Sequence, residues 1–186
     1  MANDIRSNAS TRALFELLSA SRSVALVGER SNGSQAFAME VEILVDAGFR
    51  VVPVSRRDAE ILGRRAFASI GAIPERVDIV DISDSESASV SIADDAARIG
   101  AKALWLQRGV VSPDMVQRAV DLGLTVVVDR DIGQTVVDFG IMHPSSTALY
   151  DAVDEAGRES FPASDPPPWS RVRPGGPRDR STDASP

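Results

Sequence analysis

Residues 23–35, with the sequence SVALVGERSNGSQ, combine the residue types that can hold a phosphate group. The apolar run at 24–27 predicts a buried strand that ends in a turn of small polar residues, and apolar residues recur at helical spacing after this turn. A strand that enters a helix in this way directs unpaired backbone N–H groups and the positive end of the helix dipole at one place. The turn is either a binding site for the phosphates of a nucleotide-like ligand or a tight connection without a ligand, because its spacing is not G-x-G-x-x-G. Its candidate binding residues are Gly28, Arg30, Ser31, Asn32, Gly33, Ser34 and Gln35.

Two arginines follow the second predicted strand. Ser55, Arg56 and Arg57 stand where the ribose of a dinucleotide lies in a Rossmann-type sheet. Arginines there favour a phosphorylated ribose, because a guanidinium can bind phosphate through two parallel hydrogen bonds. The alternative is a turn that carries two solvated arginines. The other candidate cofactor-binding residues follow the third and fourth predicted strands and are Ser83, Gln107 and Gly109.

The sequence does not suggest a complete catalytic group. The single histidine, His143, precedes a proline beyond the predicted sheet, so we expect it in a linker. Asp81 and Asp129 lie near strand ends without a partner base or nucleophile, and we interpret them as caps of loops. No serine lies in a G-x-S-x-G motif, and no paired spacing of ligands suggests a metal. These observations favour binding without turnover and predict neither catalytic residues nor a metal site.

A repeated phrase indicates the elements that position these residues. Three times a helical pattern ends at a glycine, and an apolar residue, a polar residue and a strand follow, in DAGFRVVPV, RIGAKALWL and DLGLTVVVD. Glycine suits the left-handed backbone after a helix, and repeated junctions of this kind with apolar strands predict a parallel sheet covered on both faces. We predict strands over 23–28, 50–55, 77–82, 101–107 and 125–130, and helices over about 10–20, 34–47, 87–99 and 113–122.

The predicted ligand crevice lies beyond the carboxyl ends of these strands. In an open parallel sheet a ligand binds where the strand order reverses, which in a doubly wound order is between the first strand and the fourth. The segment 58–74, between the second and third strands, is expected to be less regular.

Composition limits the possible partners and location. The chain has 186 residues, a length that suits one domain plus an appendage. Its hydrophobic residues, 43% of the total, are enough to form a core. Its 27 acidic and 20 basic side chains give a formal charge of −7, which disfavours nucleic-acid binding. There is no cysteine, no signal-peptide pattern and no apolar stretch near the roughly 18 residues of a membrane span. We therefore expect a cytoplasmic protein that binds neither nucleic acid nor membrane.

The chain divides into a predicted domain over 8–142 and a linker and tail over 143–186. The tail is rich in proline and has few aliphatic side chains, so burial cannot offset its ordering entropy and we expect it to be largely disordered. Trp169 is either a docking anchor for a protein partner or an exposed side chain without a role. The oligomeric state is not assigned.

Several blocks resemble the single-domain CoA-binding proteins, whose fold is similar to the CoA-binding domain of the succinyl-CoA synthetase alpha subunit. Between about residues 22 and 132 they are, in order, SVALVG, AGFRVVPV, ILGRRAFASIGAIPERVDIVDI, AKALWLQRGVVS and GLTVVVDRDI. The resemblance implies a Rossmann-like, three-layer α/β/α fold with a five-stranded, mainly parallel sheet that binds CoA or an acyl-CoA at its carboxyl edge. It also implies that the pyrophosphate lies at the loop after Gly28, the adenosine end near the loop after Val54, and the pantetheine beside the loop of Gln107. The single-domain relatives are binding proteins, since the further domains of the synthetase are missing from them.

The ligand loops depart from the family pattern. Arg30 replaces a small residue, Gln35 replaces an arginine, Ser55-Arg56 replaces Asn-Pro, Ser83-Asp84 replaces an arginine, and Asp131 replaces a cysteine. Three functions stay open. In order of preference they are a non-catalytic CoA or acyl-CoA binder, a protein-interaction module with a vestigial nucleotide pocket, and an NADP-binding oxidoreductase suggested by residues 55–57.

Overall fold

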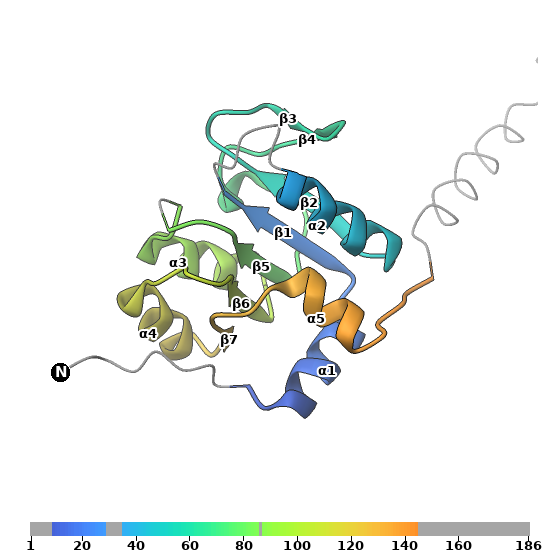
Figure 1. The fold of residues 1–186 in the computed structure, drawn as a ribbon. Coiled ribbons are helices and arrows are strands. Elements are labelled where there is room, and N and C mark those ends of the chain that lie inside the picture. Colours follow the sequence, from blue (N-terminus) through green and yellow to red (C-terminus); the bar gives the residue numbers. More distant parts are fainter. Residues whose placement is uncertain (1–8, 29–34, 86, 145–186) are drawn as a thin grey trace, which may run out of the picture. The chain divides into compact units, whose positions relative to one another are not determined.

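The computed structural model describes residues 9–28, 35–85 and 87–144 (Figure 1). Its main sheet has five strands in the order β2-β1-β5-β6-β7, and every neighbouring pair is parallel. The strands are β1 (Ser23–Val27), β2 (Arg50–Val54), β5 (Ile79–Ile82), β6 (Ala103–Leu106) and β7 (Thr125–Val127). The predicted Rossmann-like α/β class with a five-stranded sheet is confirmed. The expected tail, from residue 145 onward, lies outside the described residues.

Helices cover both faces of the sheet (Figure 1). Along β1, Val24 and Leu26 join the core of one face and Ala25 and Val27 the core of the other, so apolar side chains are needed at every position. The first face carries α1 (Thr11–Ala20), α2 (Gln35–Asp46) and α5 (Ile132–Asp138). The second face carries α3 (Val90–Arg98), α4 (Pro113–Asp121) and the 3-10 helix η1 (Ile70–Ala72). Four helices match the predicted ones within three residues, whereas α5 spans only about two turns and shows no clear period in the sequence.

The segment between β2 and β5 is less regular, as predicted, but it is not structureless. It contains an antiparallel pair, β3 (Glu60–Ile61) and β4 (Arg64–Arg65), followed by η1. Leu62 and Gly63, which join the two short strands, have φ of +51° and +72°. Phe67 then forms a bridge with Val54 at the edge of the sheet. The segment therefore leads the chain back past the carboxyl end of β2.

The strand order moves the ligand crevice from its predicted place. β1 lies between β2 and β5, and β6, the fourth strand of the sheet along the chain, pairs with β5 rather than with β1. In this order the reversal falls between β1 and β5, and ligands bind beyond the strand ends at such a point. The predicted crevice between the first and fourth strands is wrong, because the sequence shows the succession of strands but not which of them are neighbours.

The three repeated helix-to-strand junctions share one geometry. Gly48, Gly100 and Gly123 have φ of +85°, +80° and +79°, the left-handed region that favours glycine. The N–H of the next residue donates to a carbonyl five residues earlier in each case, at 2.9, 2.9 and 3.0 Å. The junctions predicted from the repeated phrase are thus confirmed. No helix in the described part of the chain is long and apolar enough to cross a membrane.

His143 belongs to the fold, so its predicted place in a linker is wrong. Its backbone N–H donates to the carbonyl of Ala47 at 2.8 Å, and its ring packs edge-on against Phe49 with 4.6 Å between ring centroids. Arg22 Nη1 donates to the ring Nδ1 at 2.7 Å, while Nε2 lies 3.2 Å from the carbonyl oxygen of Leu18. This arrangement requires the proton on Nε2 of a neutral ring.

We expect the free energy of unfolding to fall as the pH decreases through about 6.5. Burial first, and then the charge of Arg22, lower the pKa of His143 below its usual 6.5. Below pH 6.5 the unfolded chain binds a proton that the folded protein excludes, until the lower pKa of the folded state is reached. Urea unfolding of the wild type and His143→Gln between about pH 5 and 8 measures this decrease. Parallel curves for the two proteins would contradict it.

Candidate functional site

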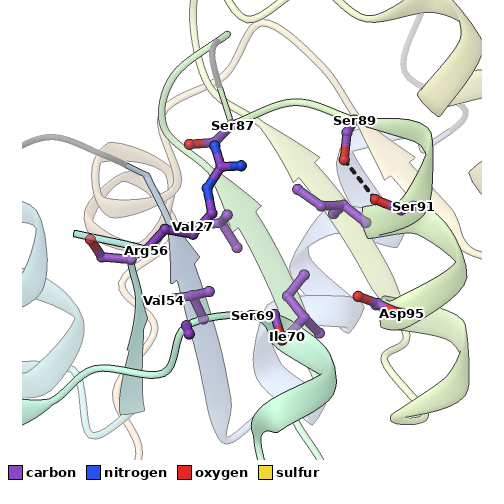
Figure 2. A pocket seen from close by; sticks show the side chains of 12 residues that line it. Val27, Val54, Arg56, Ser69, Ile70, Ser87, Ser89, Ser91 and Asp95 are labelled. Carbon is purple, nitrogen blue, oxygen red and sulfur yellow. Dashed lines mark hydrogen bonds between the residues drawn. The ribbon is translucent and has the colours of Figure 1, made fainter. Parts of the chain in front are cut away.

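A pocket of about 230 Å³ lies at the carboxyl ends of β1 and β2, on the face that α3 covers (Figure 2). Val27 and Val54, which pair in the register of the sheet, contribute the ends of the two strands. Ile70 of η1 and Ile92 of α3 add further apolar surface. Most of the polar residues in the lining are serines, namely Ser55, Ser69, Ser87, Ser89 and Ser91. The pocket thus combines apolar walls with several hydrogen-bonding groups.

Local structure places these serines around the pocket. Ser69 and Ser89 immediately precede η1 and α3 with extended backbone, which is the usual place for a serine at a helix start. Ser89 Oγ and Ser91 Oγ lie 2.8 Å apart and form a hydrogen bond (Figure 2). Ser87 N–H donates to Asp84 Oδ1 at 2.8 Å and so stabilises the loop between β5 and α3.

The charges of the pocket are distributed unevenly. Arg56 is the one basic residue among the described residues that line it, and Figure 2 shows its nitrogen atoms directed toward Ser87. Asp95 of α3 also lines the pocket, but it forms an ion pair with Arg98 of the same helix. An anionic group of a ligand would therefore interact favourably with the part of the pocket that Arg56 lines.

The structure brings Ser55 and Arg56 together in the pocket but leaves Arg57 outside its lining. Ser55 is buried, and its Oγ accepts hydrogen bonds from the backbone N–H groups of Arg57 and Asp58, each at 3.1 Å. The turn after β2 is therefore held by its own serine. Arg57 is exposed next to the pocket.

Gly28 directly follows β1 and lies against the two residues that follow β5. A Cβ atom at this position would overlap Ser83 Oγ and lie 2.9 Å from Asp84 Oδ2. Its N–H donates to the carbonyl of Val54 at 3.3 Å, so this amide is already paired within the protein rather than open to a phosphate. Ser83 is buried and its Oγ donates to the carbonyl of Val27 at 3.2 Å, which is a structural contact.

Of the remaining predicted binding residues, five lie outside the described part of the chain and two lie outside the pocket lining. Arg30, Ser31, Asn32, Gly33 and Ser34 lie outside the described residues. Gln35 is the exposed first residue of α2. Gly109, beyond β6, is exposed with φ of +80° and accepts a hydrogen bond from Ser85 at 3.3 Å.

Gln107 lies on the opposite face of the sheet, buried between β5 and α2. Its Nε2 donates to Asp81 Oδ2 at 2.7 Å and to Glu40 Oε1. Asp81 is fully buried, so its interpretation as a loop cap is wrong. Burial, and then the nearby Glu40, raise the pKa of this carboxyl well above its usual range. Asp129 is exposed, with φ of +53°.

Residues that the sequence did not single out make up much of the pocket: Ser69, Ser87, Ser89, Ser91 and Asp95. For Ser87, Ser89 and Ser91 the signal was a run of alternating serines directly after the third strand of the sheet, at the same carboxyl edge as the turn after β1. Within the described residues, no group of three or more histidines and carboxylates could hold a metal ion.

One family model, one curated relative and several solved structures are similar to this chain. The model of the CoA binding domain family matches residues 22–135, more than half of the chain. YneT of Bacillus subtilis (strain 168) is 28% identical over 122 residues, which are 66% of this chain and 90% of YneT. A hypothetical protein from Pyrococcus horikoshii OT3 has a similar fold, with a TM-score of 0.67 and 23% identity over 75% of this chain and 99% of its own. Cell-free ID.343 from Thermus thermophilus gives a TM-score of 0.63 and 26% identity over 70% of this chain and 99% of its own.

Proposed function

This chain belongs to the CoA binding domain family, and on that premise we propose that it binds CoA or an acyl-CoA at the carboxyl edge of its sheet without transforming it. The match of the family model over residues 22–135 confirms the family that the sequence blocks predicted. The observation that carries the proposal for this chain is the pocket at the ends of β1 and β2, which lies beside the reversal of strand order.

The residues of the pocket fit a part of a nucleotide. Its volume of about 230 Å³ is below the roughly 300–1,000 Å³ typical of pockets that enclose a whole drug-sized ligand, so it accommodates only a portion of CoA. Apolar walls suit the face of a base, serine hydroxyls suit a ribose, and Arg56 suits a phosphate. Gly28 directly follows Val27, which lines the pocket, and its missing side chain leaves room for Ser83 and Asp84.

Two observations support binding without turnover. The single histidine is packed against Phe49 at the amino edge of the sheet, away from the pocket. Asp81, the carboxyl group whose pKa is raised most clearly, is fully buried among α2 and the strands rather than directed into the pocket. Neither residue is placed to act as an acid or base on a ligand there.

Calorimetry and thermal unfolding with CoA, acetyl-CoA and a longer acyl-CoA test the proposal. A ligand at one hundred times its dissociation constant should stabilise the fold by about 2.7 kcal/mol. Comparison of the three ligands shows whether the acyl chain contributes to affinity. Absence of both heat and thermal shift at millimolar ligand would exclude a CoA-binding role, and consumption of the thioester would exclude the non-catalytic one.

We expect Arg56→Ala to weaken CoA binding by about tenfold or more, which corresponds to one charge-assisted hydrogen-bonded contact. The effect should be smaller for dephospho-CoA if the guanidinium contacts the 3′-phosphate. Arg57→Ala is the matched control, because the same residue type stands next in the chain but does not line the pocket. Equal losses of affinity in the two variants, or equal losses for CoA and dephospho-CoA, would show that Arg56 does not contact the 3′-phosphate.

A protein-interaction module with a vestigial pocket is the second candidate. Asp84 favours it, because its Oδ2 lies against Gly28, where the diphosphate of CoA would otherwise approach the backbone. A carboxylate at that place repels a diphosphate. The same calorimetry decides between the two candidates, since a vestigial pocket predicts no response to CoA and partner binding that is independent of it.

A further inference from the structure

Among the described residues that line the pocket, the two charged ones lie on different sides. Arg56 follows β2, whereas Asp95 belongs to the second turn of α3. In Figure 2 the guanidinium group of Arg56 lies beside Ser87, and Asp95 lies farther along α3. A phosphate group is attracted by the arginine and repelled by the carboxylate. These charges therefore direct the phosphates of a ligand toward Arg56 and leave the side of Asp95 to an uncharged part of the ligand.

The carboxylate of Asp95 is held in place by its own helix and by η1. Arg98, one turn later in α3, donates from Nη2 to Asp95 Oδ1. The side chain of Asp95 is 24% exposed and that of Arg98 is 62% exposed, so the carboxylate is the inner member of the pair. A Cβ atom at Gly71 of η1 would lie 3.1 Å from Arg98 Nη1 and 3.7 Å from Asp95 Oδ2, so the pair packs closely against η1. Arg98 thus holds Oδ1, and Oδ2 lies between α3 and η1 as a hydrogen-bond acceptor.

The apolar lining indicates which donor of the ligand meets this acceptor. Ile70 and Ile92 come from η1 and α3, the two elements that hold Asp95, and Val27 and Val54 add apolar surface from the strand ends. Apolar side chains of this kind pack against the flat face of a base, and polar groups at the edge of the base then identify it. Adenine is the base of CoA, and its exocyclic amino group is a donor that a carboxylate can bind.

We propose that Asp95 accepts a hydrogen bond from the exocyclic amino group of the ligand's adenine and thereby selects a base that carries this group. The inference rests on the proposed binding of CoA and adds a residue that determines specificity. Replacing the amino group by a carbonyl oxygen, as in hypoxanthine, would place two acceptors against each other and leave the carboxylate without its donor. A site built around a hydrogen bond discriminates strongly against a ligand that cannot form it.

Titration calorimetry with CoA and with its hypoxanthine analogue tests this role. The wild type should bind CoA about tenfold or more tightly than the analogue. Asp95→Asn should remove most of this preference, because an amide can accept from an amino group or donate to a carbonyl. Asp94→Asn is the matched control and should keep the preference of the wild type. Asp94 is the adjacent residue of the same type, but it pairs with Arg118 of α4 and does not line the pocket.

The ratio of the two affinities separates recognition of the base from a structural effect of the substitution. A variant that is partly destabilised loses affinity for both ligands alike, whereas a change of base recognition alters their ratio. Equal affinities of the wild type for the two ligands would overturn the inference and leave CoA binding intact. A preference that persists unchanged in Asp95→Asn would do the same. Absence of any response to CoA in the three proteins would overturn the proposed function, and this inference with it.

Discussion

Replacing Gly48 by alanine should lower the free energy of unfolding by about 3 kcal/mol, as the sum of a backbone and a packing cost. Gly48 has φ of +85°, where an L-residue with a Cβ is strained. The new Cβ would also lie 2.5 Å from the carbonyl oxygen and 2.9 Å from the Cβ of His143. Relief requires the backbone at His143 to move, and this backbone is held by its hydrogen bond to Ala47.

Gly123→Ala separates the two costs. Gly123 has nearly the same φ, +79°, at the equivalent junction, but nothing lies within 4 Å of its added Cβ. This control should therefore lose only about 1 kcal/mol, the cost of the left-handed backbone. Urea unfolding of both variants at one pH measures the difference. Equal losses would show that His143 does not pack against Gly48 in solution.

Gly28→Ala should produce the second large effect, a loss of about 1–3 kcal/mol in stability together with weaker CoA binding. Its Cβ would overlap Ser83 Oγ, and Ser83 cannot rotate without losing its hydrogen bond to Val27 in a buried position. The variant would also displace Ser83 and Asp84 next to Val27, which lines the pocket, and we expect CoA binding to weaken for this reason.

Ser83→Ala provides the control for this effect. Alone it should lose about 1 kcal/mol with the hydrogen bond, but combined with Gly28→Ala it should restore part of the stability, because it removes the overlapping oxygen. A double-mutant cycle from urea unfolding measures this interaction energy. Additive losses would contradict the steric explanation. If stability returns in the double variant while CoA affinity does not, Gly28 is needed for the ligand and not only for the turn.

Patterns of neighbouring residues were enough to predict most elements of the fold. The strand and helix positions followed from apolar runs and helical spacing, and the left-handed glycines from the repeated phrase at the junctions. The family followed from the order of several blocks and is confirmed. Of the candidate site, Ser55 and Arg56 were predicted and line the pocket.

The remaining features depend on contacts between distant parts of the chain. Gln107 and Ser83 were expected to face a ligand, but both are buried and bonded within the protein. His143 was expected in a linker, but it packs against Phe49, 94 positions earlier in the printed sequence.

The sequence by itself therefore determined the elements, their succession and the family, because helical period, apolar runs and junction glycines are properties of consecutive residues. Only the tertiary structure decided that β1 lies between β2 and β5, that serines before α3 complete the pocket, and that Asp81 and Glu40 meet at Gln107. These features depend on which strands become neighbours and on which helix covers each face. Such choices are made by packing over long sequence separations, and no local pattern records them.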